Sequence, residues 1–178
     1  MLNIIRLLAL MACLLPVSAQ AGPPAPSRDS MSHSLQVTGS VKTPLILTVA
    51  ELRQMAPVNG GELAVTRQNG GKAETITSYK GVRLRDILDK AVLDAPGHND
   101  VKKLAIIASA TDGYAVVFSW GELYNSPAGD SVIVYVEKNG KVLDESDGEI
   151  ALISAKDIRT GPRHVKWLNR IEVRKLAD

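Results

Sequence analysis

Short strand-like segments, separated by turns that contain glycine or asparagine, follow one another from Leu35 to Val173 and constrain the fold more than any other feature. Segment 35–41 (LQVTGSV) alternates apolar and polar residues, as a half-buried strand does. Segments 103–110 (KLAIIASA) and 113–119 (GYAVVFS) are mostly continuous apolar runs, which are typical of buried strands. We therefore expect a fold dominated by strands, with others at 62–68, 73–79, 149–154 and 164–173.

A β-hairpin is predicted at 131–143 (SVIVYVEKNGKVL), because Asn139 and Gly140 both accept the positive φ of a two-residue type I′ turn. The acidic segment 144–149 (DESDGE) does not have the spacing of an EF-hand calcium loop. We expect this segment to be the solvated end of the hairpin.

Helices are predicted where a capping box occurs, since the side chains of its first and fourth residues bind each other's backbone amides. Thr48 with Glu51 opens one such segment, and Ser119 with Glu122 opens another. An amphipathic helix is expected at 84–93, with these apolar residues on one face: Leu84, Ile87, Leu88 and Ala91. Strands with two to four short helices predict an α+β fold, with a compact mixed sheet, over residues 35–178.

The N-terminal residues differ in character from the rest of the chain. Residues 1–21 combine Arg6, an apolar run of eleven residues and a small-x-small end, which predicts a secretory signal peptide cleaved after Ala21. Segment 22–34 is rich in proline, serine and glycine and is expected to be a flexible tether. No arginine pair precedes the apolar run, so we expect export to the periplasm by the general route, which threads unfolded chains.

Charge and cysteine content exclude several kinds of function. Without Arg6, the basic residues exceed the acidic ones by only one, whereas a nucleic-acid-binding protein needs a strong basic excess. The single cysteine, Cys13, would leave with the signal peptide, so the mature protein would have no disulfide and no thiolate ligand. The histidines lack the spacing of a metal site, and no nucleophile motif of a serine hydrolase is present.

Segment 159–170 (RTGPRHVKWLNR) gathers cations around one aromatic ring. One interpretation is an ordinary strand, with Trp167 in the core and its cations in solvent. The other is a binding site, in which Arg159 and Arg163 on a rigid turn hold a phosphate or a polarised carbonyl oxygen. The TDGY segment is similarly open: Asp112 belongs either to a simple turn or to a site in which it reads the amino edge of a heterocycle beside Tyr114.

Five stretches, taken in order, resemble the molybdopterin-binding domain of the sulfite oxidase family: LTVAELRQM, YKGVRLRDIL, ATDGYAVVFSWGEL, VYVEKNGKVL and RHVKWLNRIEV. The resemblance implies a compact mixed domain with a pterin pocket at the loop ends of its central sheet. In the enzymes of that family, a cysteine thiolate binds molybdenum. The matching place here falls near Gln68 or Asn69, where no thiol is present, and an amide is a poor ligand for that metal.

The chain is more similar to the small PruR-type periplasmic proteins of this family, which lack the cysteine. That resemblance implies a non-enzymatic binder of a reduced pterin that acts as sensory partner of a membrane cyclic-di-GMP signalling protein. The alternatives are a molybdopterin-dependent oxidoreductase and an envelope protein-interaction module whose pocket is lost. The implied ligand-binding residues are Arg67, Gln68, Asn69, Asp112, Tyr114, Arg159, Arg163, His164, Lys166 and Trp167.

Overall fold

The computed structural model describes residues 31–55 and 57–176. The expected signal peptide and most of the expected tether therefore lie outside the described residues. Within the described part, no helix is long and apolar enough to cross a membrane. The helices are α1 (Val49–Gln54), α2 (Leu84–Ala91) and α3 (Trp120–Tyr124), with 3₁₀ turns η2 (Asp100–Lys103), η3 (Pro127–Ser131) and η4 (Gly161–Arg163). The strands are β1 (Ser34–Gly39), β2 (Leu45–Thr48), β3 (Val58–Gly60), β4 (Leu63–Thr66), β5 (Lys72–Ile76), β6 (Tyr79–Arg83), β7 (Leu104–Ala110), β8 (Ala115–Ser119), β9 (Val132–Lys138), β10 (Lys141–Val142), β11 (Ala151–Ser154), β12 (His164–Val165) and β13 (Leu168–Lys175).

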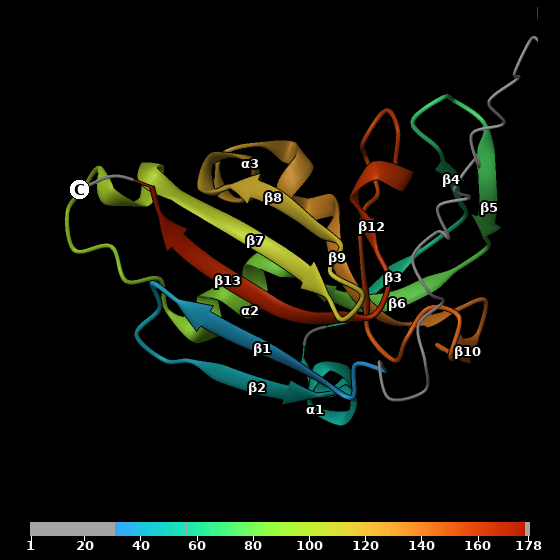
Figure 1. Cartoon of the computed structure of the whole chain (residues 1–178), viewed down its shortest axis with the longest axis horizontal. Coiled ribbons are helices and arrows are strands. Elements are labelled where there is room, and N and C mark those ends of the chain that lie inside the picture. The colour runs from blue at the N-terminus through green and yellow to red at the C-terminus, as the bar shows by residue number, and fades with distance from the viewer. Residues whose placement is uncertain (1–30, 56, 177–178) are drawn as a thin grey trace, which may run out of the picture.

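The described strands form two larger sheets and one separate hairpin. The five-stranded sheet has the order β2-β1-β13-β7-β8 and is mixed, because β1 and β13 run parallel while the other neighbours are antiparallel. The six-stranded sheet contains β12-β11-β9-β6-β3, with β10 paired to β9. Strands β4 and β5 pair only with each other and project at the end of the molecule opposite the C-terminus (Figure 1). The predicted α+β class with a mixed sheet is confirmed.

The main core lies between the two sheets and includes α2. Strand β9 explains how the layers are built, because both of its faces are apolar. Val132, Val134 and Val136 point into the main core. Ile133 and Tyr135 point the other way, into a second core that the β4–β5 hairpin covers. A strand buried on both faces reads as a continuous apolar run, which is the pattern of segment 132–136.

Several local predictions are confirmed. Both capping boxes are present, at the start of α1 and at the start of α3. Asn139 and Gly140 have φ of 54° and 73°, as a type I′ turn requires. The predicted apolar face of α2 is buried throughout. Strands β2 and β3 were not predicted: β3 is only three residues long and contains glycine, and it is held by pairing with β6.

Four predicted features are wrong in whole or in part. Segment 113–119 is not a buried strand, because β8 lies at the edge of its sheet and alternates exposed and buried residues. Segment 73–79 is divided between β5, which ends at Ile76, and β6, which begins at Tyr79. Segment 164–173 is also two strands, because Trp167 adopts a φ of 50° and the chain crosses from the six-stranded to the five-stranded sheet there. The acidic segment is solvated at 144–146 as predicted, but Asp147, which follows, is fully buried.

Candidate functional site

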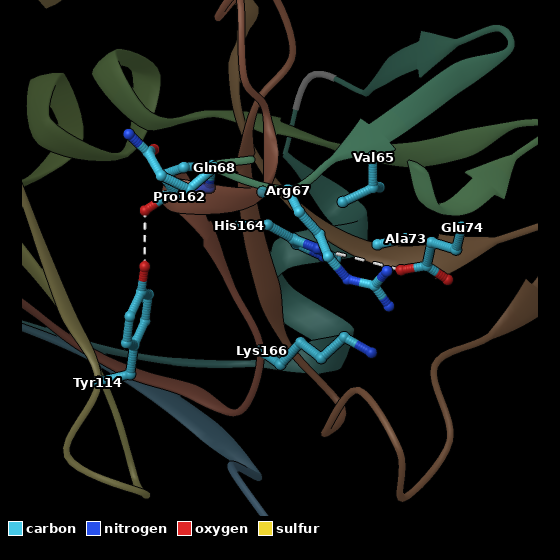
Figure 2. A pocket seen from close by; sticks show the side chains of 10 residues that line it. Val65, Arg67, Gln68, Ala73, Glu74, Tyr114, Pro162, His164 and Lys166 are labelled. Atoms are coloured by element: carbon cyan, nitrogen blue, oxygen red, sulfur yellow. Dashed lines mark hydrogen bonds and ion pairs between the residues drawn. The ribbon is translucent and has the colours of Figure 1, made fainter. Parts of the chain in front are cut away.

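A cavity of about 670 Å³ opens between the β4–β5 hairpin and the segment that carries η4 and β12. This volume lies in the range of small-molecule sites. Figure 2 shows Arg67, Glu74, His164 and Lys166 gathered on one side of it, with Tyr114 on the other. The residues that line it are Val65, Arg67, Gln68, Ala73, Glu74, Tyr114, Gly161, Pro162, His164 and Lys166.

Thr160 fixes the hairpin wall of this cavity. Its buried hydroxyl donates to the Ala64 carbonyl oxygen at 3.0 Å and accepts from the Thr66 amide at 2.9 Å. The next residue, Gly161, allows the close approach, because a Cβ there would lie 2.7 Å from the Thr66 carbonyl oxygen. A single residue of the η4 segment thus holds β4 through two hydrogen bonds across nearly a hundred residues of sequence.

His164 forms the floor of the cavity and is held from below by Tyr135. The Tyr135 hydroxyl lies 2.7 Å from His164 Nε2. Burial, and after it the nearby Lys166 charge, lower the pKa of the imidazole to about 4. Burial also raises the pKa of Tyr135 well above its usual value. His164 is therefore a neutral hydrogen-bonding group at pH 7, with Nδ1 4.0 Å from Glu74 Oε1.

Lys166 is positioned by the buried Asp147. The Lys166 ammonium lies 2.7 Å from Asp147 Oδ1, and the Lys138 ammonium lies 2.6 Å from Oδ2. Burial opposes ionisation of this carboxyl, but hydrogen bonds from the two lysines outweigh it and lower the pKa of Asp147. The carboxylate is consequently charged at neutral pH and holds one of the two cations that line the cavity.

Five of the ten residues predicted from sequence line the cavity: Arg67, Gln68, Tyr114, His164 and Lys166. The Arg67 guanidinium donates to the Lys72 carbonyl oxygen at 3.4 Å, across the mouth of the β4–β5 turn. The Tyr114 hydroxyl donates to the Pro162 carbonyl oxygen at 2.6 Å (Figure 2). Tyr114 therefore joins the β7–β8 turn to the η4 segment, at the rim of the cavity.

The other five predicted residues do not line the cavity. Asn69 Oδ1 accepts from the Gly71 amide, and Asp112 Oδ1 accepts from the Tyr114 amide, so both side chains stabilise their own turns. Arg159 lies against Gly70, at the outer end of the hairpin. Trp167 donates through Nε1 to the Glu145 carbonyl oxygen.

Arg163 is the predicted cation whose position differs most from the expectation. Its guanidinium makes two bonds to Asp157, at 2.6 and 2.7 Å, and one to Glu122 at 2.8 Å. It also lies over the Phe118 ring, 4.6 Å from the centroid. The hydrogen bonds that it donates to Asp157, and then to Glu122, raise its pKa despite partial burial. The donors of Arg163 are thus used within the fold.

Sequence reasoning missed Val65, Ala73, Glu74, Gly161 and Pro162. The signal for Glu74 was the period of two along β5, where Glu74 and the buried Ile76 fall on one face. The register supports this, because Glu74 pairs with the buried Val65 of β4. An acidic residue on the inward face of a predicted strand is unusual and marks a polar site.

The residues present do not fit a molybdenum centre but fit an organic heterocycle. Residues 31–55 and 57–176 contain no cysteine and no cluster of three or more metal-binding side chains. The cavity instead offers two cations, one carboxylate, a neutral imidazole and an aromatic ring. Such groups suit hydrogen bonding and stacking with a flat polar ring.

Comparisons with known proteins agree with this fold. The structure is similar to the sulfane dehydrogenase SoxCD from Paracoccus pantotrophus, with a TM-score of 0.59 and 18% sequence identity. The match covers 86% of this chain but only 40% of that one. No similar sequence was found among curated proteins. The family model described as the oxidoreductase molybdopterin binding domain matches residues 22–177, and the chain therefore belongs to that family.

Proposed function

We propose that this protein binds a reduced pterin without molybdenum and is not itself an enzyme. The observation that carries the proposal is the cavity between the β4–β5 hairpin and η4, whose lining offers cations, a carboxylate and an aromatic ring but no thiolate. Membership in a molybdopterin-binding family supports a pterin as the ligand, and the missing thiolate argues against the binding of molybdenum.

The lining residues match the chemistry of a pterin ring. The pyrimidinone part of such a ring is flat, with a carbonyl oxygen that accepts hydrogen bonds and an edge of N–H donors. Lys166 and Arg67 supply positive donors for the carbonyl oxygen, and the neutral His164 supplies a weaker one. The half-exposed Tyr114 ring offers a face for stacking at the rim.

We further propose that the protein acts in the periplasm as a sensor, and that its ligand-bound form engages the periplasmic domain of an inner-membrane protein that controls cyclic di-GMP. This step rests on the predicted signal peptide and on the resemblance to PruR-type proteins. It requires that pterin and partner alter each other's affinity. A pull-down of the partner from membranes, with and without tetrahydropterin, tests that coupling.

The binding proposal is tested by anaerobic calorimetric titration of the purified chain with 6-methyltetrahydropterin, with folic acid and guanine as comparison ligands. Saturable, selective binding with a Kd of about 1 µM or below supports the proposal. Lys166→Ala and Arg67→Ala should each weaken binding about tenfold, the loss of a charge-assisted bond. Lys156→Ala and Arg170→Ala are matched controls, because both residues are exposed and lie outside the cavity lining.

Elemental analysis of protein taken from its native compartment distinguishes the proposed metal-free binding from an alternative function that uses molybdenum. Stoichiometric molybdenum would favour a molybdopterin-dependent oxidoreductase with an unusual ligand set. Absence of both metal and pterin binding would leave the envelope-module alternative, in which the partner binds whether or not pterin is present.

A further inference from the structure

Four charged side chains of alternating sign join two residues that line the cavity. Lys138 Nζ lies 3.1 Å from Glu74 Oε2 and 2.6 Å from Asp147 Oδ2. Asp147 Oδ1 in turn lies 2.7 Å from Lys166 Nζ. The end members, Glu74 and Lys166, both line the cavity, while Lys138 and Asp147 stand behind them. The chain of charges therefore gives the cavity an acceptor and a cationic donor, each fixed by a partner outside it.

Glu74 is the one carboxylate among the ten residues that line the cavity. Asp112, which the sequence suggested for this role, is exposed and accepts the Tyr114 amide within its own turn. The Glu74 side chain is about one-third exposed, and although Lys138 contacts Oε2, each carboxylate oxygen keeps a lone pair for a further donor. Figure 2 shows this carboxylate on the same side as the Lys166 ammonium.

We propose that Glu74 selects ligands that carry an amino-amidine edge, by accepting the two parallel N–H donors of a 2-amino group and the adjacent ring N3. This inference rests on the proposed pterin-binding function and names the edge of the ligand that is read. A carboxylate matches two parallel donors in a bidentate geometry. Lys166 then faces the carbonyl oxygen beside N3, which the same edge brings into the cavity.

The consequence is discrimination against rings that are identical except at C2. A lumazine has an oxygen where a pterin has the amino group. Its C2 oxygen would face the Glu74 carboxylate, so that two acceptors meet and one donor is lost. A site built to hydrogen-bond a particular group rejects an analogue without it far more strongly than an apolar pocket does. Glu74→Gln would relieve the mismatch, because an amide offers both a donor and an acceptor.

The experiment is anaerobic calorimetry of the full purified chain with 6-methyltetrahydropterin and 6-methyltetrahydrolumazine. The unmodified protein should prefer the pterin by about a hundredfold, and Glu74→Gln should reduce that preference to about threefold or reverse it. Glu62→Gln is the matched control, because Glu62 is exposed just before β4 and does not line the cavity. Circular dichroism melting checks that each variant is folded.

The outcomes distinguish this inference from the function on which it rests. If the unmodified protein binds neither ring, the proposed function fails and the inference fails with it. If it binds both rings equally, or if Glu74→Gln keeps the full preference for the pterin, the inference is overturned while pterin binding stands. If the Glu62→Gln control alters the preference as much as Glu74→Gln does, the assignment to Glu74 is also overturned.

Discussion

The Tyr135 hydroxyl and His164 Nε2 lie 2.7 Å apart, and their hydrogen bond joins the second core to the floor of the cavity. Tyr135 is fully buried on β9, so its hydroxyl needs a partner inside the protein. His164 provides that partner from β12, the edge strand of the same sheet. The packing of the sheet and the chemistry of the cavity therefore depend on the same pair.

His164 should make the stability of the protein depend on pH. Its pKa is about 4 in the folded protein, compared with 6.5 for an exposed histidine. Between these values the unfolded chain binds more protons than the folded protein. The contribution of His164 to the free energy of unfolding is therefore fully present above pH 6.5 and is lost as the pH drops toward 4. We expect a loss of about 2 kcal/mol between pH 8 and pH 5, measured by urea denaturation.

His164→Gln is the control, since glutamine can still bind the Tyr135 hydroxyl but does not titrate. Carboxyl groups with a lowered pKa, such as those of Asp147 and Asp157, lose their contribution only below about pH 5, so they do not confound this window. An equal loss of stability in the glutamine variant would show that another group is responsible.

Asp147→Asn should destabilise the fold strongly. The change removes the shared negative partner of Lys138 and Lys166 at a fully buried position. Breaking a buried ion pair on one side leaves an uncompensated charge, and we expect the free energy of unfolding to fall by about 3 kcal/mol. Asp144→Asn, three residues earlier and exposed, should change it by less than about 0.5 kcal/mol. Similar urea midpoints for both variants would contradict the buried network.

Thr160→Val should loosen the β4–β5 hairpin. Valine keeps the shape but loses both hydrogen bonds to β4, whereas Thr160→Ser keeps the hydroxyl. We expect faster amide hydrogen exchange across 63–76 in the valine variant and pterin affinity about tenfold lower, because the cavity wall is no longer fixed. Unchanged exchange in that hairpin would show that other contacts hold it.

Arg163→Ala should lower stability without changing ligand affinity. The bonds to Asp157 and Glu122 are charge-assisted and partly buried, so their loss should reduce the free energy of unfolding by about 2 kcal/mol. The free energy of unfolding of Arg163→Lys should lie between those of the unmodified protein and Arg163→Ala, because lysine keeps the charge but cannot make the bidentate bond. A weaker titration with tetrahydropterin and an unchanged melting temperature would instead support the ligand-binding role suggested by the sequence.

The sequence determined those features that depend on neighbours within a few residues. The capping boxes at Thr48 and Ser119 and the turn at Asn139 are stabilised by contacts along the local chain, and the apolar face of α2 is visible in the local spacing of its residues. They can therefore be predicted from residue type and spacing. The strand character of both apolar runs, 103–110 and 113–119, also followed from composition, as did the α+β class, but burial on both faces did not hold for β8.

The cavity was only partly predictable, because sequence proximity does not say which turn residues face one another. Arg67, Gln68, Tyr114, His164 and Lys166 were expected at the site and line the cavity. Of the remaining predicted residues, Asn69 and Asp112 stabilise their own turns, whereas Arg163 forms ion pairs with partners elsewhere in the chain. Glu74 was missed because its neighbours in the cavity come from segments some ninety residues away, such as Lys166.

Tertiary structure alone decided where the last predicted strand breaks and which charges are buried. Trp167 takes a positive φ as it packs against Gly148, where a Cβ would lie 2.7 Å from the Trp167 Cα. Asp147 is buried because the β9 and β12–β13 segments bring Lys138 and Lys166 to it from opposite sides. Neither close backbone packing between distant segments nor the pairing that makes a buried charge tolerable is encoded in any local pattern.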